Sequence, residues 1–257
     1  MNEGEVHYSI ANGVASIVFD RPLQRNAMTW AMYDGLAKAC REIAWNPEVR
    51  VAVLRGAGGE AFVAGTDIAQ FKGYTANDGL RYEHHIHASI ERIEELVKPT
   101  IAVVEGFCTG GGLIIASACD FRIATPSAKF GVPIARTLGN CISAHNVARL
   151  IVAFGVARAK RMLLLAEMVG ADEALACGFV HQLATPAEID AATGTMAARL
   201  KEHAPLTMQA AKEIIRRLIA KGLPDDEDMI RICYGSADFQ EGITAFLAKR
   251  KPNWTGG

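Results

Sequence analysis

The chain has 257 residues, of which half are hydrophobic and 21% are charged, and its formal net charge is −1. This composition is close to that of an average soluble globular protein, and the near-zero charge excludes a general attraction to nucleic acid or anionic membranes. Six cysteines are scattered without a C-x-x-C pair, and no segment offers the roughly 18 unbroken apolar residues of a membrane span. We therefore expect a soluble, cytoplasmic protein with a large α/β core and no metal ion.

The first elements predicted are a β-hairpin and a helix. Asn12-Gly13 interrupts two strand-like stretches between residues 8 and 19, and this dipeptide tolerates the positive φ angles of a type I′ turn. After the hairpin, Thr29 can cap a helix in which apolar side chains recur at helical spacing until Asn46-Pro47 ends it.

Strands and helices then alternate. Apolar runs at 51–54 and 101–104 predict buried strands, with a helix over 78–96 between them, and 121–123 predicts another short strand. From about residue 143 the pattern is mostly helical. Alternating strands and helices followed by helices predict an α/β fold with a helical C-terminal part.

Two glycine-containing turns, Ala64-Gly65-Thr66-Asp67 and Gly110-Gly111-Gly112, carry the functional prediction. The first turn is expected to follow the strand at 51–54 and the second the strand at 101–104. Each is expected to lead into a helix, where main-chain N–H groups lack intrahelical partners and the helix dipole is positive. Two such turns that meet can bind one oxyanion, and removing one donor from such a site costs about 10²–10³ in rate. The alternatives are close helix–strand packing at the triple glycine and simple helix capping by Asp67.

An ordered set of motifs resembles the enoyl-CoA hydratase/isomerase, or crotonase, superfamily. The motifs are Arg21-Pro22, Asn26-Ala27, Phe62-Val63-Ala64-Gly65-Thr66-Asp67-Ile68, Lys98-Pro99, Gly110-Gly111-Gly112, Cys119-Asp120, Gly178-Phe179-Val180 and Lys251-Pro252. The resemblance implies a spiral of ββα repeats over 1–195 and a C-terminal helical trimerisation region over 196–257. It also implies a homotrimer or homohexamer.

The same resemblance implies an acyl-coenzyme A thioester as substrate and no tightly bound cofactor. The thioester oxygen is expected to accept hydrogen bonds from the main-chain N–H groups of Thr66 and Gly111. Contacts to coenzyme A are expected from Arg25, Ala27, Ala64, Thr66, Asp67, Ile68, Gly111, Phe246 and Lys249. For the last two, a solvated helix end is the alternative.

Two positions depart from the family pattern. The hydratases of the family carry glutamates where this chain has Ile114 and Ile134, and isomerases keep a carboxylate at the second place. An aliphatic side chain cannot move a proton, and a positioned acid–base group contributes typically about 10²–10⁴ in rate. Ordinary two-glutamate hydration is therefore not expected, and we expect Ile114, Ile134 and Cys141 to line the acyl pocket.

Other polar side chains are then candidates for proton transfer or substrate binding. Arg136 can hold a carboxylate on the acyl group, with Asn140 adding hydrogen bonds, although surface contacts explain both residues equally well. His84 belongs to a group of titratable side chains at 83–87, for which a solvated helix face is the alternative. A packed thiol is favoured over a nucleophile at Cys141, because no partner for a thiolate is visible.

Two classes of function remain open on the sequence alone. One is an enzyme that stabilises a thioester enolate with Thr66 and Gly111 and uses unusual groups for proton transfer. Within it, hydration, decarboxylation or hydrolysis of a carboxylated acyl-CoA, and racemisation are all possible. The other is a catalytically inactive acyl-CoA-binding module.

Overall fold

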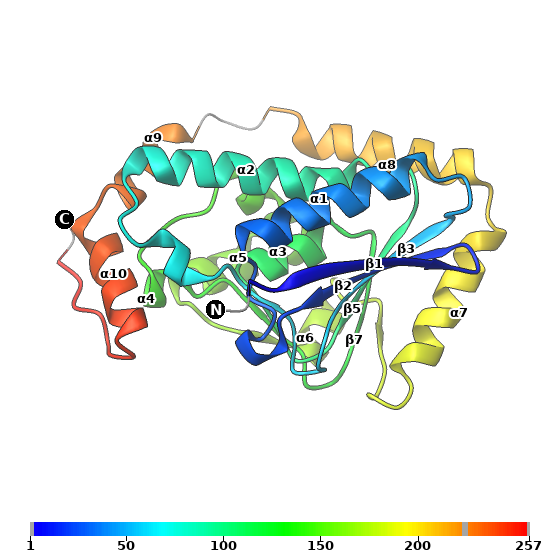
Figure 1. The fold of residues 1–257 in the computed structure, drawn as a ribbon, viewed down its shortest axis with the longest axis horizontal. Helices are drawn as coiled ribbons and strands as arrows, with labels where there is room; N and C mark the ends of the chain where they lie inside the picture. The colour runs from blue at the N-terminus through cyan, green and yellow to red at the C-terminus, as the bar shows by residue number, and fades with distance from the viewer. Residues whose placement is uncertain (1–2, 223–225, 256–257) are drawn as a thin grey trace.

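The computed structural model describes residues 3–222 and 226–255 (Figure 1). One layer is a six-stranded sheet. In spatial order its strands are β1 (Glu5–Ala11), β2 (Val14–Asp20), β3 (Val51–Gly56), β5 (Thr100–Val104), β7 (Phe121–Ala124) and β10 (Gln182–Leu183). Only β1 and β2 pair antiparallel, through a turn in which Asn12 and Gly13 have φ angles of 52° and 78°. The predicted hairpin, the predicted strands at 51–54 and 101–104 and the predicted short strand at 121–123 are confirmed.

A second, four-stranded sheet was not predicted. Its strands are β4 (Ala61–Ala64), β6 (Phe107–Thr109), β8 (Lys129–Gly131) and β9 (Val169–Gly170). The first three are parallel to one another, and each follows directly after a strand of the larger sheet. The chain therefore repeats a strand–strand–helix order, as expected for ββα units.

This second sheet corrects the prediction for the two glycine-containing turns. They follow β4 and β6, not the longer strands at 51–54 and 101–104. The triple glycine leads into helix α3 (Gly111–Ala118), as expected, whereas the first turn leads into a short 3₁₀ helix, η2 (Ile68–Phe71). The long helix α2 (Ala76–Glu94) begins only afterwards.

Helices α1 (Trp30–Trp45) and α2 lie side by side (Figure 1). The hydroxyl of Thr29 accepts a hydrogen bond from the N–H of Met32 at 3.2 Å, which confirms the predicted cap of α1. Thr75 and Asp78 form a capping box at the start of α2. Both helices thus begin at side chains that satisfy their free N–H groups.

The remaining helices follow β8. They are α4 (Ile134–Thr137), α5 (Ala144–Leu164), α6 (Ala171–Ala176), α7 (Ile189–Glu202), α8 (Pro205–Ala220), α9 (Glu227–Tyr234) and α10 (Ala237–Leu247), and a 3₁₀ turn, η1 (Pro22–Gln24), precedes α1. The division expected after residue 195 falls within α7. In Figure 1, α4, α9 and α10 gather at the end of the molecule where α2 begins; α9 packs on α2, and α10 packs on η2.

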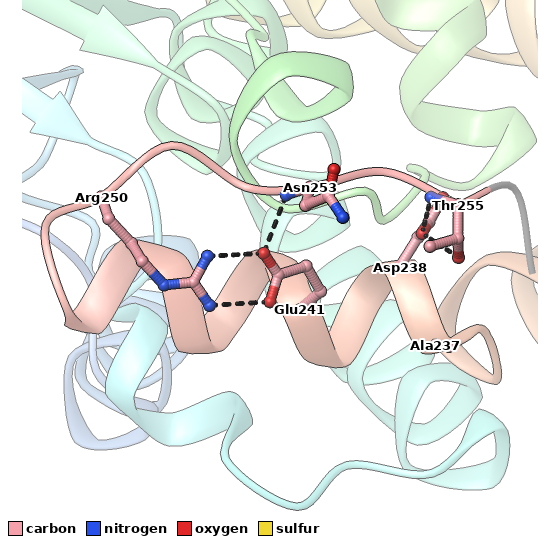
Figure 2. A pocket seen from close by; sticks show the side chains of 6 residues that line it. All are labelled: Ala237, Asp238, Glu241, Arg250, Asn253 and Thr255. Carbon is pink, nitrogen blue, oxygen red and sulfur yellow. Dashed lines mark hydrogen bonds and ion pairs between the residues drawn. The ribbon is translucent and has the colours of Figure 1, made fainter.

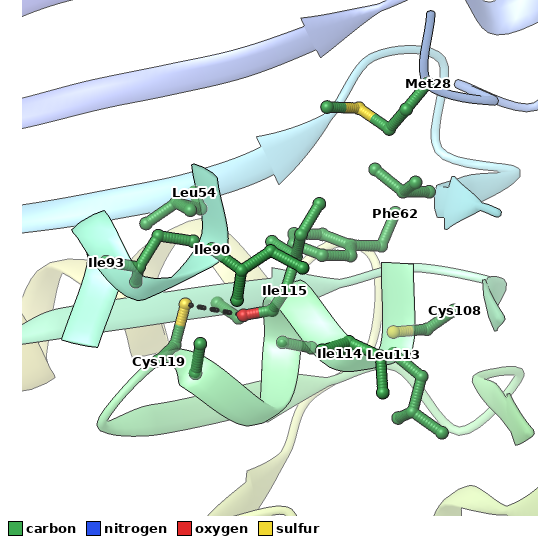
Figure 3. Close-up of a cluster of buried hydrophobic side chains, with 14 of the residues drawn as sticks. Met28, Leu54, Phe62, Ile90, Ile93, Cys108, Leu113, Ile114, Ile115 and Cys119 are labelled. Carbon is green, nitrogen blue, oxygen red and sulfur yellow. Dashed lines mark hydrogen bonds between the residues drawn. The ribbon is translucent and has the colours of Figure 1, made fainter. Parts of the chain in front are cut away.

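A buried apolar cluster joins the sheets to α2 and α3. Figure 3 shows Leu54 of β3 and Ile90 and Ile93 of α2 gathered around Ile115 of α3. Ile114 belongs to the same cluster and is 1% exposed. This packing fixes the position of α3, and with it the glycine-rich turn at its start. Within the described ranges, no helix is long and apolar enough to cross a membrane.

Candidate active site

The two glycine-containing turns lie against each other. β4 and β6 are neighbouring parallel strands, and a Cβ atom on Gly110 would lie only 3.4 Å from the Cα atom of Gly65. Both residues have positive φ angles, 95° at Gly65 and 52° at Gly110, which favour glycine. A Cβ atom on Gly112 would lie 2.0 Å from the carbonyl oxygen of Val63, so close helix–strand packing explains this third glycine.

Thr66 and Gly111 each present a main-chain donor at this contact. Thr66 forms an isolated parallel bridge with Met28, in which Met28 bonds to Gly65 and Asp67 at 2.8 and 2.9 Å. In a parallel bridge the N–H of the middle residue points to the opposite side, here the side of β6 and α3. Gly111 is the first residue of α3, so its N–H has no intrahelical partner. Among residues 3–222 and 226–255, neither N–H donates a hydrogen bond to protein.

Two buried tyrosines bind the side chain of Thr66. Its Oγ1 atom lies 2.9 Å from the hydroxyl of Tyr33 on α1 and 2.7 Å from that of Tyr82 on α2. Burial raises the pKa of Tyr33 to about 12 and that of Tyr82 well above its usual value, so both phenols keep their protons near neutral pH. A Cβ atom on Gly111 would lie 2.5 Å from the Tyr33 hydroxyl oxygen and 3.4 Å from Thr66 Oγ1. The tyrosines therefore surround the contact between the two turns.

Glu83, next to Tyr82 on α2, is the most unusual titratable group near this contact. It is 2% exposed, and its two carboxylate oxygens accept hydrogen bonds from the Tyr234 hydroxyl at 2.9 Å and from the Ser143 N–H at 3.0 Å. Burial raises the pKa of Glu83 to about 7, against the opposing effect of these hydrogen bonds. Asn140 donates to the same Tyr234 hydroxyl at 3.1 Å, which links the loop after α4 to α9.

Comparison with known proteins identifies the family. A family model described as enoyl-CoA hydratase/isomerase matches residues 9–257. The chain belongs to the enoyl-CoA hydratase/isomerase family. The short-chain-enoyl-CoA hydratase of Clostridium acetobutylicum is 33% identical, over 93% of this chain and 92% of that protein. The methylmalonyl-CoA decarboxylase of Escherichia coli is 32% identical, over 95% of both. A solved methylmalonyl-CoA decarboxylase in complex with 2-nitronate-propionyl-CoA has a TM-score of 0.90 and 31% identity, with 98% of this chain and 99% of that one covered.

In this member of the enoyl-CoA hydratase/isomerase family, the two positions at which hydratases carry glutamates are occupied by isoleucines in apolar surroundings. Ile114 is buried in the core cluster, and Ile134 is half-buried at the start of α4 and packs against that cluster. Cys141 also packs against it. Contact with Cys233, together with burial, raises the pKa of the Cys141 thiol, so the protonated, unreactive form is favoured. This environment fits a packed thiol at Cys141.

The predicted polar candidates separate into two groups. Asn140 points inward, as its bond to Tyr234 shows, whereas Arg136 on α4 and His84 on α2 are exposed. Helix phase explains His84: it follows Glu83 by one residue and so faces away from the buried stripe that contains Leu80, Glu83 and Ile86. That stripe was the sequence signal that could have distinguished Glu83 from His84. Within the described part of the chain, no group of three or more His, Cys, Asp or Glu side chains could hold a metal ion.

Most residues expected to contact coenzyme A lie around the first turn. The N–H of Ala64 donates to the main-chain carbonyl oxygen of Arg25 at 3.0 Å, and the Arg25 guanidinium lies 4.8 Å from the centre of the Phe107 ring. Ala27 and Ile68 flank the Met28–Thr66 bridge. Asp67 accepts a hydrogen bond from Ala69 at 3.1 Å and pairs with Arg21 at 2.8 Å. Asp67 therefore has the capping role that the sequence offered as its alternative.

Phe246 and Lys249 are exposed near the end of α10. Figure 2 shows the segment that follows folded back along this helix. Arg250 holds Glu241 through two bonds of 2.6 and 2.8 Å, and the N–H of Asn253 donates to the same carboxylate at 2.8 Å. The last described residues are thus attached to α10, next to the two residues expected to contact coenzyme A.

Proposed function

We propose that this protein is an enzyme that binds an acyl-CoA thioester and stabilises its enolate with the main-chain N–H groups of Thr66 and Gly111. The supporting observation is the geometry of the Met28–Thr66 bridge. It directs the Thr66 N–H towards the start of α3, where the Gly111 N–H also has no hydrogen-bond partner in the described part of the protein. Donors of this kind stabilise a reaction in which negative charge develops on the thioester oxygen.

The reaction we favour forms the enolate without the two glutamates of the hydratases. Ile114 and Ile134 cannot activate water, which argues against hydration by that route. Loss of carbon dioxide from a 2-carboxyacyl thioester leaves an enolate directly, so it needs oxyanion donors and a proton source but no base for the first step. The similarity to methylmalonyl-CoA decarboxylases supports this choice. Exposed Arg136 stays a candidate for the substrate carboxylate.

A panel of thioesters tests this function. Methylmalonyl-, malonyl-, succinyl-, crotonyl- and butyryl-CoA are each incubated with the protein in D₂O, with binding measured by calorimetry and products by mass spectrometry. We expect deuterium at the carbon next to the thioester, decarboxylation of a carboxylated substrate, and little hydration of crotonyl-CoA. Binding without exchange or turnover across the panel would contradict the proposal and support an inactive acyl-CoA-binding module.

A substitution at the second turn tests the oxyanion site itself. In Gly111→Ala, the new methyl group meets the Tyr33 hydroxyl at 2.5 Å and must displace it or the turn. We expect turnover to fall about 10²-fold, as for loss of one oxyanion donor. The matched control is Gly194→Ala in α7. There, apart from the adjoining residues and backbone of α7 itself, no atom of the described residues lies within 4 Å of the new Cβ, and turnover should not change.

We also propose that the chain assembles as a homotrimer or homohexamer. The support is a set of exposed apolar side chains on α8, comprising Leu206, Ile214, Ile215 and Leu218. Analytical ultracentrifugation measures the assembly directly, and a monomer at micromolar concentration would contradict it.

A further inference from the structure

We infer that Glu83 is the acid–base group of this site, exchanging a proton with the carbon next to the thioester, and that Tyr234 and Asn140 position it. The inference rests on the proposed enolate function. It assigns to a buried side chain of α2 the proton transfer that Ile114 and Ile134 cannot perform.

The first support is how the Glu83 carboxyl group is held. It lies between three segments: its own helix α2, Tyr234 at the end of α9, and Ser143 at the start of α5. Packing fixes Tyr234 in turn, since it is fully buried against Phe71 and Phe239 and receives a hydrogen bond from Asn140. A carboxyl group with both oxygens held by a packed phenol and a main-chain N–H has one well-defined orientation, which proton transfer requires.

The second support is its position relative to the oxyanion turns. Tyr82, the preceding residue, binds Thr66 at 2.7 Å, and its ring lies 6.2 Å from that of Tyr234. Burial is the main cause of the raised pKa values of Tyr33 and Tyr82, the two phenols bound to Thr66, and the charge of Glu83 raises both pKa values further. The carboxyl group is therefore close enough to interact electrostatically with the hydroxyl groups at the proposed oxyanion site.

The third support is that no cation among the described residues is paired with the Glu83 carboxyl group. The ionisable groups coupled to Glu83 are Tyr33 on α1, Tyr82 on α2, Cys141 in the loop after α4, and Asp226 and Tyr234 at the two ends of α9. None of these is positively charged, and among the described residues no lysine, arginine or histidine forms an ion pair with Glu83, so no cation there holds the carboxyl group permanently ionised. Near neutral pH it can both accept and donate a proton, as an acid–base catalyst must.

The loop after α4 also leaves an open acceptor beside this group. Asn140 uses its Nδ2 atom to donate to Tyr234 and to the carbonyl oxygen of Cys141, while its Oδ1 atom is buried without a hydrogen-bond partner among the described residues. A buried acceptor of this kind is usually satisfied by a ligand or an ordered water. Because Asn140 lies next to Tyr234, its free Oδ1 atom offers a bound molecule a polar contact beside the hydrogen-bonded pair of Glu83 and Tyr234.

The O–H bond of protonated Glu83 breaks and a C–H bond forms from the electron pair of the enolate, which restores the thioester carbonyl group. The Glu83 carboxylate then regains a proton from water. In the reverse direction, the carboxylate removes the proton from the same carbon, and the electron pair moves to the oxygen bound by Thr66 and Gly111.

The test compares Glu83→Gln with Glu83→Asp and with Glu95→Gln, a substitution of an exposed glutamate after the last turn of the same helix. The assay is exchange of the hydrogens next to the thioester of butyryl-CoA in D₂O, with binding measured separately. We expect Glu83→Gln to lose about 10²–10⁴ in exchange rate while binding butyryl-CoA within a few fold, Glu83→Asp to recover part of the rate, and Glu95→Gln to match wild type.

The pH profile distinguishes catalysis from a structural role. Exchange starts with the carboxylate form, so the wild-type rate should rise with pH and level off above about 7. Tyr234→Phe removes a hydrogen bond that stabilises the carboxylate, so the inflection should move to higher pH. If Glu83→Gln has the wild-type exchange rate and pH profile, the inference about Glu83 is overturned, but the proposed function is not. A wild-type protein that exchanges and converts none of the thioesters overturns the proposed function as well.

Discussion

The two halves of α2 each hold a carboxylate, one half-buried and one buried, in opposite ways. Near the C-terminal end, Glu94 is 23% exposed and receives two hydrogen bonds of 2.7 and 2.6 Å from Arg149, whose side chain is 6% exposed. In the first half, Glu83 is 2% exposed and, within the part of the chain that is described, receives hydrogen bonds only from the neutral donors of Tyr234 and Ser143. A guanidinium beside a carboxylate forms a charge-assisted ion pair, whereas burial without a cation favours the protonated form of a carboxyl group. One helix thus combines a structural ion pair with a group suited to proton transfer.

Breaking the ion pair should have the largest effect on stability. In Glu94→Gln, the buried Arg149 guanidinium keeps its bond to Asn146 at 2.8 Å but loses its charged partner. Removing one partner of a buried pair destabilises by about 3–5 kcal/mol, and the partial exposure of Glu94 argues for the lower end of this range. Urea unfolding near pH 8 measures it. The exposed pair Arg92–Glu95 is the control, because Glu95→Gln should change stability by less than about 1 kcal/mol; equal losses in the two variants would contradict the comparison.

Glu83→Gln, in contrast to Glu94→Gln, should become more stable relative to wild type as the pH rises. The pKa of Glu83 is raised from 4.5 to about 7 in the folded protein, so between these values the folded state binds more protons than the unfolded state. The stability contributed by this proton is therefore lost as the pH rises through that window. The variant lacks the titration, and its stability relative to wild type should increase by about 3 kcal/mol between about pH 4.5 and pH 8. Parallel unfolding curves at the two pH values would show that the carboxyl group is not held as described.

The elements that sequence could predict are those with strong periodicity or clear turn chemistry. The hairpin at Asn12-Gly13 and the helix capped by Thr29 follow from local rules, and both are present. The second sheet was missed because β4, β6, β8 and β9 have only two to four residues each, too few to show an alternating pattern. The two turns were recognised from their glycines, although the strands before them were assigned wrongly.

The sequence predicted only those residues of the candidate site that stand in short, recognisable motifs. Thr66 and Gly111 stand in recognisable motifs, but the Glu83–Tyr234 bond joins residues 151 positions apart, for which a single sequence carries no local signal. Tyr33 likewise carries no local signal of a role in the site, because its contact with Thr66 crosses from α1 to the turn after β4. Tertiary packing brings these phenols to the turns.

The smallest predicted effect concerns the tyrosines that lie between Glu83 and the oxyanion turns. Tyr33→Phe removes one hydroxyl from Thr66 Oγ1 and leaves the bond to Tyr82 at 2.7 Å. The loss of one buried hydrogen bond should destabilise the protein by about 1 kcal/mol. Because Thr66 remains held from α2, the exchange rate should fall only a few fold and its pH profile should keep the inflection near 7. Unfolding curves and butyryl-CoA exchange measure both effects. If Tyr33→Phe instead abolishes the inflection as completely as Glu83→Gln, the phenols at Thr66 take part in proton transfer, and the division between the two halves of α2 must be redrawn to include α1.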